Sequence, residues 1–266
     1  MPKLAANLTW LFTELPFEER FGAAARHGFR AVEMLFPYEL PPERLRELLD
    51  MHGLELVLFN LPPGDWTAGE RGLTALSGRE REIDAGVALA RTFARATRCH
   101  RVHAMAGLVP PGTDRTMCEP TYIENLRRIS RSFRDDGVTV LIEPLNVIEN
   151  PTYHLQTTAA ALATIAAVSE SNLSLQLDLY HTQITEGDLE RKIRALAGKF
   201  AHVQIAGNPH RNEPDTGEVD YDYILGVLDA NGYDGWIGCE YRPRTTTPAG
   251  LAWANRYLGR KARSAH

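Results

Sequence analysis

The sequence alternates short apolar segments with longer amphipathic segments along almost its whole length, and this alternation constrains the fold more than any other feature. The apolar segments predict strands at Leu4–Trp10, Ala31–Leu35, Glu55–Asn60, Arg101–Met105, Val138–Glu143, Leu173–Asp178, His202–Ile205 and Trp236–Glu240. The amphipathic segments predict helices at Phe17–His27, Pro42–His52, Gly78–Thr97, Pro120–Arg134, Thr157–Ser169, Leu189–Ala197, Tyr221–Ala230 and Pro248–Leu258. Because strands that alternate with helices indicate βαβ units, the pattern favours an α/β fold with a parallel sheet.

The number of repeats predicts that this sheet closes. Eight strands, each followed by a helix, are typical of a single (β/α)8 TIM barrel, and a chain of 266 residues has the length of one such domain. We expect the barrel to occupy residues 1–258 and a disordered tail to follow at 259–266. An open doubly wound sheet is the alternative, but the sequence contains no glycine-rich dinucleotide fingerprint and no P-loop.

Composition and charge argue against several classes of function. The formal net charge of -5 at pH 7 disfavours nucleic-acid binding, which needs a basic face. No apolar run approaches the length of a membrane span, and the opening MPKLAANLTWLF lacks the apolar core and cleavage site of a signal peptide. Cys99, Cys118 and Cys239 form no CxxC pattern and are expected to be reduced thiols. We therefore expect a cytoplasmic protein without a nucleic-acid or membrane partner, whose exposed helices leave a homo-oligomer open.

The longest irregular stretch is LPPGDWTAGERGLTALS at residues 61–77. Loops of this length are usually functional or disordered, and the apolar Trp66, Leu73 and Leu76 indicate order. We interpret the stretch as a folded loop over the barrel mouth, with a packed peripheral excursion as the alternative.

Four predicted strands in the second half carry an oxygen-bearing side chain at or near their ends: Glu143, Asp178, Gln204 and Glu240. In a barrel these ends surround the mouth, so residues distant in sequence can meet. Three carboxylates at one point need a cation or must take up protons. All-oxygen ligation suits Mg²⁺ or Mn²⁺, and Co²⁺ is also accepted. The pattern thus predicts a divalent metal site, although Asp178 alone could be a helix cap and Gln204 a buried structural amide.

Other polar residues are expected around the same mouth. His181 follows the sixth strand, where a neutral imidazole could donate a hydrogen bond to a substrate oxygen. Arg211, in the loop GNPHRNEPDTGE, could clamp a substrate carboxylate; the alternative is a surface ion pair with Glu213. Asn60 and His103 lie at the ends of the third and fourth strands and are expected to face the mouth as substrate-binding residues.

The chain order of these residues, with EPLN around Glu143 and DLYH around Asp178, resembles that of the xylose-isomerase-like barrels and, among them, the hydroxypyruvate isomerase family. The resemblance also rests on NLTWLF, FPY at 36–38, NLPPGDWTAGERG at 60–72, GRE at 78–80, GNPHRNEPDTGEVDYDY at 207–223 and GYDGWIGCEYRP at 232–243. It implies a TIM barrel with catalytic glutamates at Glu143 and Glu240, and metal ligands at Glu143, Asp178, Gln204 and Glu240. Related ketose 3-epimerases have histidine where this chain has Gln204, which favours the isomerases.

The implied reaction interconverts hydroxypyruvate and tartronate semialdehyde by proton transfer through an enediolate. A divalent cation can act as a Lewis acid in such a reaction, and a glutamate can move the proton. The expected partner is a small 2-oxo acid or ketose. A sister branch acts on 2-oxo-tetronates, so that activity, or a related ketose isomerase or epimerase activity, is the first alternative. An abasic-site endonuclease and a non-catalytic sugar-acid binder are more remote alternatives.

Overall fold

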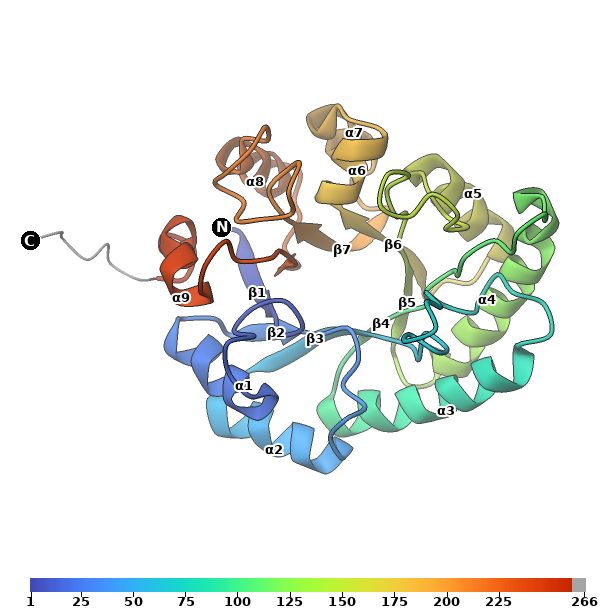
Figure 1. Ribbon diagram of the computed structural model, residues 1–266, viewed down its shortest axis with the longest axis horizontal. Coiled ribbons are helices and arrows are strands. Elements are labelled where there is room, and N and C mark those ends of the chain that lie inside the picture. The colour runs from blue at the N-terminus through green and yellow to red at the C-terminus, as the bar shows by residue number, and fades with distance from the viewer. Residues whose placement is uncertain (260–266) are drawn as a thin grey trace, which may run out of the picture.

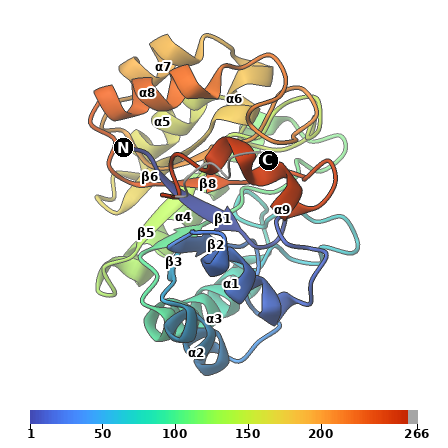
Figure 2. The same cartoon turned by 90° about the vertical axis from the view of Figure 1, so that its left-hand side faces the viewer.

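The computed structural model describes residues 1–259 and confirms the predicted barrel (Figure 1). Eight parallel strands form one closed sheet in the order of the sequence, and β1 pairs with β8 to complete it (Figure 2). The strands are β1 (Lys3–Asn7), β2 (Ala31–Glu33), β3 (Glu55–Asn60), β4 (Arg101–His103), β5 (Thr139–Ile142), β6 (Leu173–Asp178), β7 (Phe200–Ile205) and β8 (Trp236–Cys239). Of the expected tail at 259–266, residues 260–266 lie outside the described residues.

Helices connect successive strands and surround the barrel (Figure 1). They are α1 (Phe17–Arg26), α2 (Pro42–His52), α3 (Glu80–Thr97), α4 (Glu119–Arg134), α5 (Thr158–Val168), α6 (Leu179–Thr185), α7 (Leu189–Ala195), α8 (Tyr221–Ala230) and α9 (Thr247–Gly250), with 3-10 turns η1 (Arg115–Met117) and η2 (Leu251–Ala254). Local signals define some ends sharply. The helix α2 begins at Pro42, where no N–H is needed, and stops at Gly53, whose φ of 63° suits glycine.

Two expectations about helices were wrong. The sequence indicated no helix directly after β6, but α6 begins there because the Asp178 carboxylate accepts a hydrogen bond from the Tyr180 backbone at 2.7 Å and caps the first turn. The expected final helix at Pro248–Leu258 is a short α9 that continues as η2. The capping role proposed for Asp178 as an alternative is therefore real, and the same residue is also buried beside the cavity described below.

Five strands end one to three residues earlier than expected: β1, β2, β4, β5 and β8. The strand β1 stops at Asn7 rather than at Trp10, and β2 stops at Glu33 rather than at Leu35. The register between β2 and β3 shifts at Glu33, which interrupts regular pairing there. As a result, Asn7 and Glu33 also lie at strand ends, on the same rim as the predicted acids.

The long loop at residues 61–77 is folded against the end of β4. The backbone of Gly72 forms an isolated bridge with Ala106, and Leu73 and Ala75 are buried. Trp66 and Arg71 line the cavity at the barrel mouth, which confirms the interpretation as a loop over the mouth. The three cysteines are buried and free, as expected. None of the described helices is both long enough and apolar enough to span a membrane.

Candidate active site

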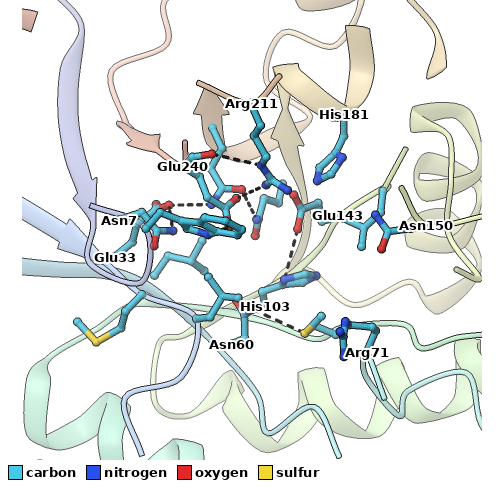
Figure 3. A pocket seen from close by; sticks show the side chains of 18 of the residues that line it. Asn7, Glu33, Asn60, Arg71, His103, Glu143, Asn150, His181, Arg211 and Glu240 are labelled. Atoms are coloured by element: carbon cyan, nitrogen blue, oxygen red, sulfur yellow. Dashed lines mark hydrogen bonds and ion pairs between the residues drawn. The ribbon is translucent and has the colours of Figure 1, made fainter. Parts of the chain in front are cut away.

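A cavity of about 470 Å³ opens at the carboxyl ends of the strands. Five predicted site residues from the second half of the barrel meet here with residues from β2, β3 and β4 (Figure 3). Among the predicted site residues, those that line it are Asn60, His103, Glu143, His181, Gln204, Arg211 and Glu240. Asp178 is buried beside them, with its carboxylate 3.5 Å from the Arg211 guanidinium.

The strand register explains why these side chains meet. Asp178 at the end of β6 is the direct neighbour of Gln204 on β7, and Gln204 is the neighbour of Gly238 on β8. Glu143 and Glu240 lie one residue beyond the last paired residues of β5 and β8. The parallel register therefore places residues from four strands on one rim, as the sequence pattern predicted.

Burial raises the pKa of all three acids. The pKa of Glu143 lies well above its usual value because of desolvation first, and then because of the negative charges of Glu240 and Asp178. Desolvation raises the pKa of Glu240 to about 8, although the Arg211 charge opposes the shift. Desolvation likewise raises the pKa of Asp178 to about 6. Carboxylates held this close together in a buried site are stabilised by any cation that enters it.

Arg211 is the cation that these acids already contact. Its Nη2 lies 3.1 Å from Glu240 and 3.5 Å from Asp178, and its side chain is only 12% exposed. The alternative of a surface ion pair with Glu213 is wrong, because Glu213 pairs with Arg244 instead. Arg211 is therefore part of the buried charge cluster, and its ability to clamp a substrate carboxylate stays a prediction.

The two predicted histidines are buried and neutral. Desolvation lowers the pKa of His103 to about 3 and that of His181 well below 6.5. The backbone N–H of Asn146 donates to Nδ1 of His181 at 3.3 Å, so the ring proton of this neutral imidazole resides on Nε2. That Nε2 lies 3.6 Å from Asp178, which leaves it as a hydrogen-bond donor at the site. Nδ1 of His103 lies 3.5 Å from the Glu143 carboxylate.

The two predicted amides differ in how firmly they are held. Within residues 1–259, the hydrogen-bond partner of the Asn60 Nδ2 group is the Met105 sulfur at 3.7 Å, a weak partner that leaves the amide available to a ligand. The Gln204 Nε2 donates to Glu33 at 2.7 Å, and its Oε1 accepts from Gln176 at 2.6 Å. The alternative for Gln204 was a buried structural amide paired to the backbone. Within residues 1–259 its amide pairs instead with the side chains of Glu33 and Gln176, which fix its orientation.

Sequence reasoning missed a layer of residues beneath the predicted ligands. Glu33 is fully buried and accepts hydrogen bonds from Asn7 at 2.9 Å and Gln204 at 2.7 Å, with His202 at 2.6 Å from its other oxygen. A Cβ at Gly238 would lie 2.2 Å from this carboxylate, so the glycine on β8 makes space for it. The available signal is a glutamate inside the apolar run AVEML, in the middle of the strand predicted at Ala31–Leu35.

Trp10 is a second missed residue. It lies in the turn after β1, and its indole Nε1 donates to Oε1 of Glu240 at 3.0 Å. Its ring also faces the guanidinium groups of Arg211 and Arg242, at 5.2 and 4.9 Å from the ring centroid. Nothing in the local sequence indicates this role, because the partner of Trp10, Glu240, lies 230 positions away in the chain.

The donor set fits a hard divalent cation. Glu143, Asp178 and His181 each place one potential ligand atom within 4.8 Å of the others. Oε1 of Glu143 is buried and has no hydrogen-bond partner among the described residues, an arrangement that is costly unless something else satisfies it. Since Nε2 of His181 carries a proton, carboxylate oxygens with the nearby Gln204 amide form the more suitable set, which is the oxygen set that Mg²⁺ and Mn²⁺ prefer.

The raised carboxyl pKa values predict that the metal-free protein becomes less stable in alkali. An acid whose pKa is higher in the folded than in the unfolded state stabilises the fold below its unfolded pKa, and this contribution is lost as the pH rises through the folded value. Between pH 7 and 8.5, above the range of ordinary histidines, Glu240 loses its proton in the folded state. We expect the free energy of unfolding of the metal-free protein to fall on the order of 1 kcal/mol per pH unit for each proton that unfolding releases.

Urea unfolding in EDTA at pH 7.0, 7.5, 8.0 and 8.5 measures this slope. The Glu240→Gln variant lacks the titrating group, so its free energy of unfolding should depend less steeply on pH. Saturating Mn²⁺ should remove this pH dependence in the wild type. A stability that rises with pH over this range would contradict the prediction.

Comparison with known proteins agrees with the fold. The family described as the xylose isomerase-like TIM barrel matches residues 21–257. A 2-oxo-tetronate isomerase from Cupriavidus necator is 50% identical over 98% of this chain and 100% of its own. A hydroxypyruvate isomerase from Escherichia coli is 44% identical over 97% of this chain and 100% of its own.

A solved structure is also similar over nearly the whole chain. The crystal structure of a protein described as an AP endonuclease, family 2, from Brucella melitensis is 49% identical, covers 97% of this chain and 99% of its own, and superimposes with a TM-score of 0.95. The curated relatives are named isomerases, so the alternative of a non-catalytic binder is set aside. The chain is an isomerase that belongs to the xylose isomerase-like TIM-barrel family.

Proposed function

We propose that this enzyme is a metal-dependent isomerase that interconverts hydroxypyruvate and tartronate semialdehyde. One observation carries the proposal: Glu143 is buried in the cavity within reach of Asp178 and has one carboxylate oxygen without a partner among the described residues. An orphaned buried oxygen beside a second acid is suited to hold a cation and to face a reacting carbon. The relatives that carry the name hydroxypyruvate isomerase support the choice of substrate.

Glu143, Asp178, Gln204 and Glu240 are the residues that would hold Mg²⁺, Mn²⁺ or Co²⁺. When bound, such an ion supplies Lewis-acid stabilisation of negative charge on substrate oxygens. Glu33 supports the Gln204 ligand, because a carboxylate only accepts hydrogen bonds and so forces the Gln204 Nε2 toward itself. The Gln204 oxygen is thereby directed away from Glu33.

While the proton of the C3 hydroxyl passes to the C2 oxygen, the reaction requires a proton to leave C3 of hydroxypyruvate and a proton to arrive at C2, through a planar enediolate. Glu143 and Glu240 are the two carboxylates proposed to carry these protons. They lie on different strands, and each is oriented by a separate partner: His103 at 3.5 Å from Glu143, and Trp10 at 3.0 Å from Glu240. The Nε2–H of His181 is available to donate to an oxygen of the substrate as charge develops there.

The substrate test is a direct assay of two compounds. Hydroxypyruvate and a four-carbon 2-oxo-tetronate would each be supplied with Mg²⁺, Mn²⁺ or Co²⁺, and with EDTA. We expect kcat/KM for hydroxypyruvate to exceed that for the tetronate by at least about tenfold, the ratio that roughly 1.4 kcal/mol of differential binding produces. A reversed ratio would assign the chain to the activity named for the Cupriavidus necator relative.

The same assay carried out in D₂O tests the mechanism, because it measures whether deuterium enters the substrate at C3. Proton transfer through an enediolate with a solvent-exchanging carboxylate replaces hydrogen at C3 by deuterium as the substrate turns over. A direct shift of hydride between the carbons would leave the label out and would contradict the proposal.

The endonuclease alternative has less support from the site. The cavity is lined by Glu33, Glu143, Glu149 and Glu240, and the chain carries a net charge of -5, whereas a DNA-binding groove must attract phosphates. A salt-dependent shift of abasic DNA at physiological ionic strength, followed by strand cleavage, would restore it.

A further inference from the structure

The motif NLPPGDWTAGERG at residues 60–72 contains an arginine, Arg71, that has no role in the proposed chemistry. Arg71 lines the cavity together with His103 and Glu143, and its side chain is half-buried. In Figure 3 it lies below His103, on the side of the cavity away from Glu240 and Arg211. Its guanidinium stacks on the Trp66 ring, 3.8 Å from the centroid. Arg71 therefore presents a positive charge on the side of the cavity away from Glu240 and Arg211.

The guanidinium of Arg71 has no carboxylate partner within residues 1–259. Its Nη1 donates to the backbone oxygens of Trp66 at 3.2 Å and Glu70 at 2.7 Å, while Nε and Nη2 donate to none of the described residues. The other enclosed arginine of the cavity, Arg211, is already within ion-pair distance of Asp178, Glu149 and Glu240. Among the described residues that line the cavity, Arg71 is thus the half-buried arginine whose charge no carboxylate neutralises.

The loop holds Arg71 in a fixed position. The neighbouring Glu70 pairs with Arg79 at 2.5 and 3.1 Å and accepts from the Asp65 backbone at 2.5 Å, so its charge is engaged away from Arg71. The next residue, Gly72, has φ of 107°, and a Cβ there would lie 2.3 Å from the Met105 carbonyl oxygen. Only glycine allows this close approach to the chain after β4. The binding group is therefore preorganised, which lowers the entropic cost of using it.

We propose that Arg71 binds the carboxylate of the substrate and so makes the enzyme selective for 2-oxo acids over neutral ketoses. A planar guanidinium with free Nε and Nη2 donors on one edge matches the two oxygens of a carboxylate. The cavity acids repel an anion, and Arg71 supplies the local field that offsets this repulsion. The inference rests on the proposed function, since it names the group that recognises the substrate of that reaction.

The test compares hydroxypyruvate with dihydroxyacetone, its neutral counterpart in which CH₂OH replaces the carboxylate. Arg71→Gln should lower kcat/KM for hydroxypyruvate by about 10- to 100-fold, mostly through KM, which is the range expected for a lost charge-assisted hydrogen bond. The value for dihydroxyacetone should change by less than about threefold. Arg71→Lys keeps the charge but not the two parallel donors, so its loss of kcat/KM should be smaller and confined to hydroxypyruvate. This variant decides the test if Arg71→Gln does not fold.

Two matched variants control for charge and for position. Arg81 is exposed on α3 and does not line the cavity, so Arg81→Gln removes the same charge without touching the proposed contact. Arg242 lines the cavity rim but is exposed, and Arg242→Gln tests the competing arginine. A loss in Arg71→Gln no larger than in Arg81→Gln overturns the proposal, as does a loss confined to Arg242→Gln or an equal loss for both substrates.

Binding of tartronate, a non-isomerisable hydroxy diacid, separates this inference from the proposed function. If the wild type turns over no hydroxypyruvate with any of the metals, the proposed function fails, yet calorimetric titration with tartronate still measures anion binding. Affinity at least about tenfold weaker in Arg71→Gln than in Arg81→Gln supports the carboxylate site. Equal affinity, or no binding by the wild type, overturns it.

Discussion

Glu143→Gln is expected to lower kcat by about 10²- to 10⁴-fold, the range that a positioned acid–base group contributes. The substitution keeps the size of the side chain and removes its negative charge and its ability to take a proton. The fold should survive, because Glu143 is an acid whose burial raises its pKa and so favours the uncharged form. At pH 8 without metal, the melting temperature of the variant should equal or exceed that of the wild type. Steady-state kinetics with circular-dichroism melting measures both effects.

Glu149→Gln is the matched control for this substitution. Glu149 also lines the cavity, but its side chain is 41% exposed and it accepts hydrogen bonds from Asn146 and Tyr180 at the rim. We expect its kcat to fall by less than about tenfold, since a rim hydrogen bond contributes roughly 1 kcal/mol. Turnover by Glu143→Gln at the level of this control would remove Glu143 from the mechanism.

Glu240→Gln should show a loss of the same order, and deuterium exchange separates the two glutamates. The residue that removes the C3 proton is needed for exchange of that proton with D₂O. The residue that returns a proton to C2 is needed only for product formation. If a variant exchanges the C3 hydrogen but forms no isomer, the residue substituted in that variant is therefore the one that returns a proton to C2. Full exchange and full product formation in both variants would contradict the assignment of proton transfer to these side chains.

Removal of divalent metal is expected to produce the other large effect. Lewis-acid stabilisation of a developing oxyanion contributes several kcal/mol, so dialysis against EDTA should lower kcat/KM on the order of 10³-fold. Added Mg²⁺, Mn²⁺ or Co²⁺ should restore activity, and electron paramagnetic resonance should count one bound Mn²⁺ per chain. Asp178→Asn should lower Mn²⁺ affinity and, in the absence of metal, leave the fold intact.

The control for metal removal is the same protein dialysed in parallel against the same buffer without EDTA. Residual metal would be measured on the same sample by mass spectrometry. Wild-type turnover with less than about one metal ion per hundred chains would contradict metal dependence, and it would leave Glu143 and Glu240 as the reacting groups by themselves.

The order and type of the elements could be predicted from sequence because they depend on local periodicity. The bounds of β3, β6, α2 and α8 agree with the expected ranges, since apolar runs and capping residues such as Gly53 define them locally. The acids at Glu143, Asp178 and Glu240 could also be found, because a charge at the end of an apolar strand is visible in one dimension. Closure of eight parallel strands then brings them to one rim.

What the sequence could not supply is which side chains satisfy one another, because those partners come from strands far apart in the chain. Glu33 and His202 are 169 positions apart and meet only across the closed barrel. Trp10 reaches Glu240 across 230 positions, and Arg211 contacts the acids rather than its sequence neighbour Glu213. Local periodicity therefore determined the barrel and its acidic rim, whereas the tertiary structure decided burial, hydrogen-bond partners and protonation, since these depend on distance and desolvation in three dimensions.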